Sequence, residues 1–134
     1  LDLLQKIYGK VSITQTISKE YGKKLPNWVI IKTIKDDKTT KLLEVQVDVG
    51  EASAIALALR NNDSVLILDD WKARRFAERL GITVTGTLGV IIKAKNTGII
   101  SSIKPFLSKI RKTNFRISKE LENAALREAN EKID

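Results

Sequence analysis

The sequence predicts an α/β fold with a short parallel sheet, formed by a single domain over residues 1–134. Short apolar segments alternate with helical segments of about ten residues, as in proteins built from parallel strands and helices. The apolar run Val65–Leu68 shows no alternation, which is typical of a parallel strand covered on both faces. Residues 50–60 are apolar on nearly every side, as expected of a central helix.

The elements of the first half follow from apolar spacing and from capping residues. Residues 1–8 have apolar side chains at helical spacing, and Gly9 is placed to end that helix. Thr14 can cap a helix that runs to about Tyr21, where Gly22 can end it. The other expected segments are a strand at 11–13, an extended segment at 28–34, a polar loop at 36–41 and the helix at 50–60. Residues 40–48 fit neither the helical nor the strand period.

The second half continues the alternation and then becomes helical. After the strand at 65–68, glycines and capping residues mark the remaining boundaries. The expected elements are a helix at 71–80 ended by Gly81, a strand at 82–84, a helix at 87–96 stopped by Gly98, a helix at 103–112, and a helix at 118–132 capped by Ser118.

The chain contains neither cysteine nor histidine. Disulfides, structural zinc, thiol nucleophiles and histidine-dependent catalysis are therefore excluded. Oxygen ligands alone suit magnesium, manganese or calcium. The sequence has no apolar run of membrane-spanning length and no signal-peptide pattern, so we expect a cytoplasmic protein.

A formal net charge of +8 favours a polyanionic partner. No acidic residue occurs between Glu78 and Glu120, whereas basic residues are frequent there. This segment is interpreted either as a phosphate-binding patch or as a solvated lysine-rich face.

Several carboxylates stand where a site is expected. Asp69 and Asp70 follow the strand at 65–68, and open α/β sheets bind ligands at the carboxyl ends of their strands. One of them can cap the next helix, which leaves the other unexplained. Glu51 opens the central helix, where the helix dipole alone would favour an acid, and Glu20 lies near a helix end, where the dipole opposes one. If these acids converge on a hard cation beside a basic flank, they indicate a nuclease.

Sequence motifs extend this interpretation over most of the chain. They are GEASAIALA, LDDWKAR followed by A-x-x-L-G, V-x-GTLGV, AK-x-x-G-I and F-x-IS-x-EL. Together they closely resemble a prokaryotic family of unknown function related to PIN domains, over residues 48–131. The opening LDLLQKIYGKVSIT is similar as well, with lower specificity.

The resemblance implies a Rossmann-type, three-layer PIN-like fold and a metal-dependent endoribonuclease like the VapC toxins of toxin-antitoxin pairs. Glu20, Glu51 and Asp70 match the family's catalytic acids, with Asp70 favoured as a ligand and Asp69 as a cap or a second ligand. These four acids would bind Mg²⁺ or Mn²⁺. Lys72, Arg74 and Arg75 are candidate contacts to RNA phosphates. An antitoxin protein and a second copy of the chain in a homodimer are the expected protein partners.

The family also carries a first catalytic Asp at the end of an amino-terminal strand, and no residue here matches it. We therefore expect that the first strand is missing from this chain, so that the molecule is impaired, or that a partner chain completes the site. The alternative function is an inactive PIN-fold module that binds RNA or a protein partner.

Overall fold

The computed structural model describes residues 2–35, 38–113 and 117–133, and these contain eight helices and four short strands. The chain divides into two compact units, which we describe separately. The amino unit is Tyr8–Gly86, and the carboxyl unit is Thr87–Asp134 together with Leu1–Ile7. The expected alternation of helices and parallel strands is confirmed.

The strands form two parallel ladders, both in the amino unit. Strand β1 (Val11–Thr14) pairs with β2 (Val29–Lys32), and β3 (Leu66–Ile67) pairs with β4 (Val84–Thr85). Each pair is joined through a helical connection, as parallel pairing requires. The prediction of short parallel strands is therefore confirmed.

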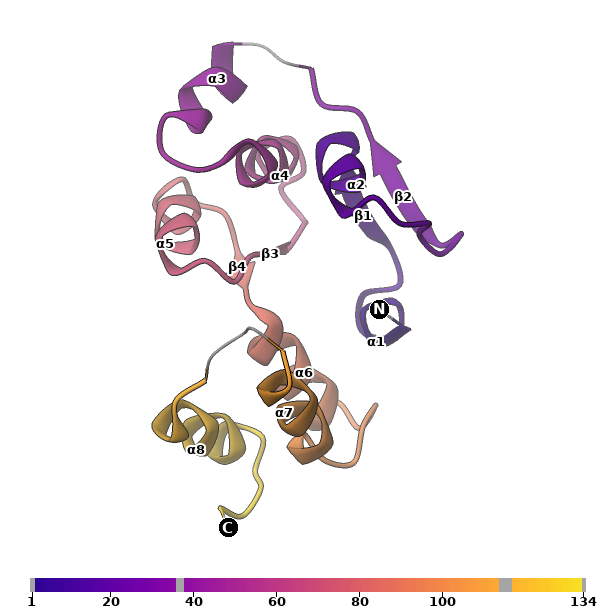
Figure 1. Ribbon diagram of the computed structural model, residues 1–134, viewed down its shortest axis with the longest axis vertical. Helices are drawn as coiled ribbons and strands as arrows, with labels where there is room; N and C mark the ends of the chain where they lie inside the picture. Colours follow the sequence, from indigo (N-terminus) through magenta and orange to yellow (C-terminus); the bar gives the residue numbers. More distant parts are fainter. Residues whose placement is uncertain (1, 36–37, 114–116, 134) are drawn as a thin grey trace. The chain divides into compact units, whose positions relative to one another are not determined.

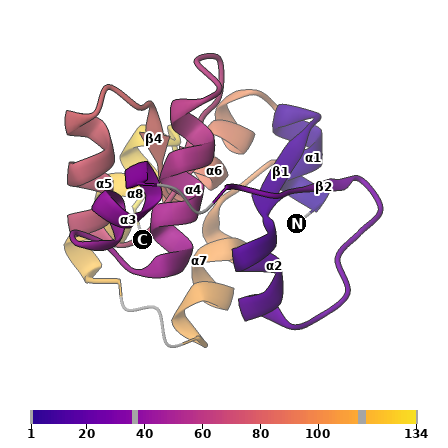
Figure 2. The ribbon, with the colours of Figure 1, turned by 90° about the horizontal axis from the view of Figure 1, so that it is seen from above.

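Helix α4 (Val49–Leu59) is the centre of the amino unit, as its apolar composition predicts. In Figures 1 and 2 it lies between α2 (Gln15–Tyr21), β1 and β2 on one side and α3 (Lys38–Glu44) and α5 (Trp71–Arg79) on the other. The alanines at its buried positions allow its neighbours to approach closely. Helix α5 contributes the fully buried Ala73 and Ala77 to the same core.

The carboxyl unit is helical within its described residues and has a core of its own. It contains α6 (Thr87–Asn96), α7 (Lys104–Arg111), α8 (Lys119–Glu128) and most of α1 (Asp2–Tyr8). The core side chains are Ile91, Ile103, Leu107, Ala125, Leu126 and Ala129. Ser118 caps α8 by accepting a hydrogen bond from the Leu121 amide, as predicted.

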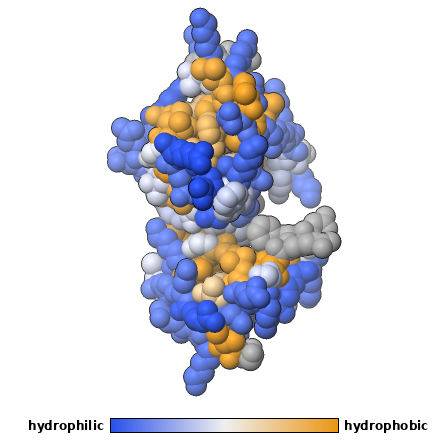
Figure 3. Space-filling view, turned by 90° about the vertical axis from the view of Figure 1, so that its left-hand side faces the viewer, coloured by the Kyte–Doolittle hydropathy of each residue, from blue (hydrophilic) through white to orange (hydrophobic). Residues whose placement is uncertain are grey.

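The prediction of a polar loop at residues 36–41 is wrong for the part that the structure describes, because Lys38–Glu44 forms helix α3. Residues 36 and 37 lie outside the described residues. The helix is stabilised by tertiary packing: Leu43 and Thr40 are buried, and Thr40 also bonds to the Lys35 carbonyl. Its other face leaves Leu42 and the following Val45 more than 70% exposed. Figure 3 shows hydrophobic residues, in orange, at the surface in the upper part of the view, at the height of α3 and α4 in Figure 1.

The last helix is shorter than predicted, since α8 ends at Glu128 rather than at residue 132. Asn130 has a φ of 59°, which breaks the helical conformation. Beyond it, the Glu131 carboxylate accepts hydrogen bonds from the Ser102 hydroxyl at 2.6 Å and from the Ile103 amide at 2.7 Å. These two bonds hold Glu131 against the start of α7. The chain therefore does not form a further turn of α8.

Candidate active site

Glu51 lies in the first turn of α4 and forms a capping box with Asp48. The Asp48 carboxylate accepts a hydrogen bond from the Glu51 amide at 2.7 Å, and the Glu51 carboxylate accepts one from the Asp48 amide at 3.2 Å. Two amide groups at the helix start are thereby satisfied. The same pair of bonds brings two carboxylates together at the surface.

Glu20, near the end of α2, reaches the same helix start. A Cβ atom placed on Gly50 would lie 2.7 Å from Glu20 Oε2 and 3.0 Å from Oε1. Only the missing side chain at Gly50 therefore leaves room for this carboxylate. Since Gly50 precedes Glu51, Glu20 is held beside the start of α4, where the helix dipole favours a negative charge.

A buried chain of hydroxyl groups connects β1 and α2 to α4. The Ser53 hydroxyl donates to the Gly50 carbonyl at 2.7 Å, and the Thr14 hydroxyl lies 2.7 Å from Ser53 Oγ. Thr14 also caps α2 by accepting from the Ile17 amide at 3.1 Å. Thr14 and Ser53 are only 1% and 3% exposed, so water does not compete for these bonds. They hold the helix that carries Glu20 against the helix that carries Glu51.

Asp70 begins α5, the neighbouring helix, and is its N-cap. Its Oδ2 accepts a hydrogen bond from the Ala73 amide at 2.9 Å. Burial raises the pKa of the Glu51 carboxyl, and repulsion from the carboxylates of Asp48 and Asp70 raises this pKa further. The bond from the Asp48 amide opposes the increase. Asp70 therefore lies close enough to Glu51 for their charges to interact.

Asp69 points to a different place from Asp70. Its Oδ1 lies 3.0 Å from the position that a Cβ would occupy on Gly86, and Arg74 Nη1 lies 3.2 Å from the same position. The Arg74 Nε atom is buried and has no hydrogen-bond partner among the described residues. Asp69 and Arg74 thus meet at the end of β4, where Gly86 provides the space for both.

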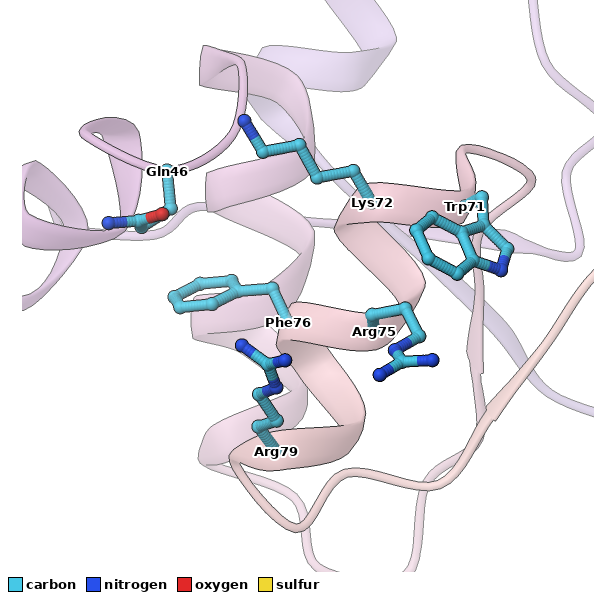
Figure 4. Close-up of a pocket in the computed structure, with 6 residues that line it drawn as sticks. All are labelled: Gln46, Trp71, Lys72, Arg75, Phe76 and Arg79. Atoms are coloured by element: carbon cyan, nitrogen blue, oxygen red, sulfur yellow. The ribbon is translucent and has the colours of Figure 1, made fainter.

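Lys72 and Arg75 lie on the outer face of α5. They line a surface pocket with Gln46, Trp71, Phe76 and Arg79 (Figure 4). The Arg75 guanidinium lies 5.0 Å from the centroid of the Trp71 ring, within the range of a cation–π interaction. Trp71, Phe76 and Arg79 were not among the predicted site residues, although the spacing of residues 71, 75 and 79 along one helix face could have indicated them.

The chemistry of the acidic side chains determines whether they could bind a metal ion. Carboxylate oxygens suit a hard divalent cation, and such a cation would relieve the repulsion that acts on Glu51. Among the described residues, however, no three acidic side chains lie close enough together to form a ready ligand group. Glu51 and Asp70 each accept a bond from a helix-start amide, so their carboxylates serve as caps in this conformation.

No helix in the described part of the chain has the length and apolar character needed to cross a membrane. In comparisons with known proteins, the family model DUF3368, described as a PIN domain, matches residues 1–131. No curated protein and no solved structure matches the sequence significantly.

Proposed function

The chain belongs to the PIN-domain family, which has an α/β fold of the nuclease type, and on that premise we propose that it is a Mg²⁺- or Mn²⁺-dependent endoribonuclease. The observation that carries the proposal is that Glu20 lies against Gly50 at the start of α4, next to Glu51, whose pKa is raised by burial and by the nearby carboxylates of Asp48 and Asp70. Acids whose pKa is shifted by burial and by neighbouring charges are candidates for function.

In this proposal Glu20, Glu51 and Asp70 hold the metal, and Asp69 assists from the adjacent position. A bound divalent cation would polarise the phosphodiester and supply hydroxide from water. The capping box with Asp48 keeps the Glu51 carboxylate at the start of α4, and the N-cap bond keeps the Asp70 carboxylate at the start of α5. Lys72, Arg74 and Arg75 would contact RNA phosphates, and the placement of Arg74 beside Gly86 supports a contact near Asp69.

The biological setting that we propose is the prokaryotic cytoplasm, with this chain as the toxin of a toxin-antitoxin pair. An antitoxin would cover the acids and present a basic residue to them. We also propose a homodimer, which the exposure of Leu42 (71%), Val45 (76%) and Val49 (54%) supports, because apolar side chains that gather at a surface favour a protein contact. Sedimentation should then show a dimer, and Leu42→Glu should convert it to a monomer.

The experiment that tests the proposed activity is the cleavage of a labelled structured RNA with Mg²⁺, with Mn²⁺ and with EDTA. We expect metal-dependent cleavage that Asp70→Asn and Glu51→Gln abolish. Both variants retain the capping groups, since Asn caps helices well and Gln can replace Glu in a capping box. The matched control is Asp63→Asn, which removes an exposed acid from the turn after α4.

The same variants test the metal site without reference to turnover. Mn²⁺ should raise the melting temperature of the natural sequence and of Asp63→Asn, because a ligand that binds the folded state stabilises it. Asp70→Asn should remove that increase. If neither metal produces cleavage or a thermal shift in any variant, the proposal is wrong.

A further inference from the structure

The outer face of α5 combines aromatic rings with positive charge. At about 100° per residue, Trp71 and Phe76 lie about 140° apart around the helix, and Arg75, Arg79 and Lys72 all fall between them. The indole of Trp71 is 69% exposed, although a large aromatic ring is usually buried. The one acidic residue of the helix, Glu78, falls outside this arc and does not line the pocket.

Figure 4 shows how these side chains are arranged. The Phe76 ring projects from the middle of α5 toward Gln46, with Lys72 on one side of it and the Arg79 guanidinium on the other. Phe76 is partly buried against the core of the amino unit, so its ring is held in place. Trp71 lies at the first turn, where Arg75 contacts its ring. The surface therefore offers two aromatic rings and three cations over nine residues, about 13 Å of helix.

We propose that this face of α5 is a platform that binds an unpaired stretch of RNA, with bases stacked on Trp71 and on the Arg75 guanidinium and with phosphates on Lys72, Arg75 and Arg79. The proposal rests on the proposed ribonuclease function and adds its substrate-positioning surface. Stacking on an aromatic ring beside a basic groove is how proteins bind unpaired nucleic acid without sequence preference. A duplex offers no free base faces to such a ring.

The position of the platform connects it to the acids. Trp71 directly follows Asp70, so the platform begins next to one of the carboxylates that we propose to hold the metal. An RNA strand that runs along α5 would be led to those carboxylates at the amino end of the helix. The cations attract the backbone there, whereas the acids would repel it without a bound cation.

The test is binding in EDTA, where no cleavage occurs. The probes are a labelled twelve-nucleotide oligoadenylate, the corresponding twelve-base-pair duplex, inorganic polyphosphate and polyglutamate. The chain has two tryptophans, so Trp28→Phe leaves Trp71 as the only one, and its fluorescence reports on the platform. The charge-matched control is Arg127→Ala with Lys132→Ala, two exposed cations of the carboxyl unit.

We expect oligoadenylate to quench Trp71 fluorescence, and polyphosphate to bind without quenching it. Trp71→Ala should raise the Kd for oligoadenylate about fivefold or more. Arg75→Ala with Arg79→Ala should lower the slope of log Kd against log salt by about 1.4, because each of the two phosphate contacts in a single strand contributes about 0.7. The control pair should leave Kd within about twofold of the natural value.

The proposal would be overturned if Trp71→Ala left oligoadenylate binding unchanged, or if the control pair weakened that binding as much as the platform variants do. Tighter binding of polyglutamate than of oligoadenylate would also overturn it, and would assign the face to an acidic protein segment. The outcome is separable from that of the proposed function. Quenching by RNA without cleavage in Mg²⁺ keeps the platform and rejects the nuclease. Cleavage with an unchanged kcat/KM in Trp71→Ala keeps the nuclease and rejects the platform.

Discussion

The two units of the protein surround their partly buried carboxylates in opposite ways. In the amino unit, burial and the nearby Asp48 and Asp70 raise the pKa of Glu51. In the carboxyl unit, burial also acts to raise the pKa of Glu131, but bonds from the Ile103 amide and the Ser102 hydroxyl, together with Lys95 and Lys104, outweigh it and lower that pKa. One carboxylate is repelled by its neighbours, whereas the other is held by them.

This difference distinguishes acids that lie beside positive groups from acids that lie beside other acids. Glu122 in α8 is 5% exposed and pairs with Arg111 Nε of α7 at 2.7 Å, so a buried charge is neutralised there. Glu51 receives its hydrogen bond from an uncharged amide and has carboxylates as its electrostatic neighbours. The contrast supports the proposed site in the amino unit, whereas Glu122 of α8 has a structural role.

The largest expected effect is that of Glu51→Gln. We expect a loss of ribonuclease activity of about a hundredfold or more, the range for removal of a catalytic group. Because the folded pKa of Glu51 lies above its unfolded value, the stability of the natural protein falls as pH rises through that interval. The variant lacks this fall, so thermal melts from pH 4 to pH 8 should show it gaining stability over the natural protein. Glu78→Gln, an exposed control, should show neither change.

Gly50→Ala should separate activity from stability. The added Cβ would lie 2.7 Å from Glu20 Oε2, so the flexible carboxylate must move, and metal-dependent cleavage should fall about 10- to 100-fold. The melting temperature should hold or rise, since Ala favours a helix over Gly by about 1 kcal/mol. In a Glu20→Gln background the substitution should cause no further loss of activity. An additive loss would show that Gly50 acts by another route.

Arg111→Ala tests the opposite side of the comparison. Among the described residues, Lys119 at 4.0 Å is then the remaining ion-pair partner of the buried Glu122, and we expect a loss of about 1–3 kcal/mol in the free energy of unfolding by denaturant. Arg127→Ala on the same helix pair should stay within about 0.5 kcal/mol. A normal stability for Arg111→Ala would mean that Glu122 needs no partner and that the contrast with Glu51 fails.

Glu131→Gln has the smallest expected effect, about 1 kcal/mol at neutral pH, because a neutral acceptor replaces a charged one. The folded pKa of Glu131 is below its unfolded value, so its contribution is present above the unfolded pKa and is lost as pH falls through the folded pKa. The difference between the variant and the natural protein should therefore disappear in acid. A difference that persists at pH 2 would contradict this interpretation.

Local signals in the sequence were enough to predict most of the fold. Thr14 and Ser118 are good capping residues, and each caps the helix expected of it. Helix α5 is capped by Asp70, not by Asp69, which was the favoured cap. Helix α3 was missed because Thr39 and Thr40 are poor helix formers, and the burial of Leu43 that stabilises it depends on α4. The early end of α8 depends on Glu131 bonding to residues 28 and 29 positions earlier, which no local pattern reveals.

The candidate site was less accessible to prediction. That acids open α4 and α5 follows from strand and helix order, but the approach of Glu20 depends on a missing Cβ at Gly50. The preference for Asp69 as the cap of α5 was wrong as well. The two aspartates differ because Asp70 caps α5, whereas Asp69 faces Gly86 at the end of the paired strand.

The most direct test is a carboxyl-carbon NMR titration of Glu51 with and without Mg²⁺. Without the cation, the Glu51 pKa should lie above its ordinary value, and Asp70→Asn should lower it by removing a repelling charge. With Mg²⁺ the pKa should fall further, because the cation competes with the proton for the carboxylate. A Glu51 pKa that responds neither to Asp70→Asn nor to Mg²⁺ would contradict the claim that these acids form one cation-binding cluster.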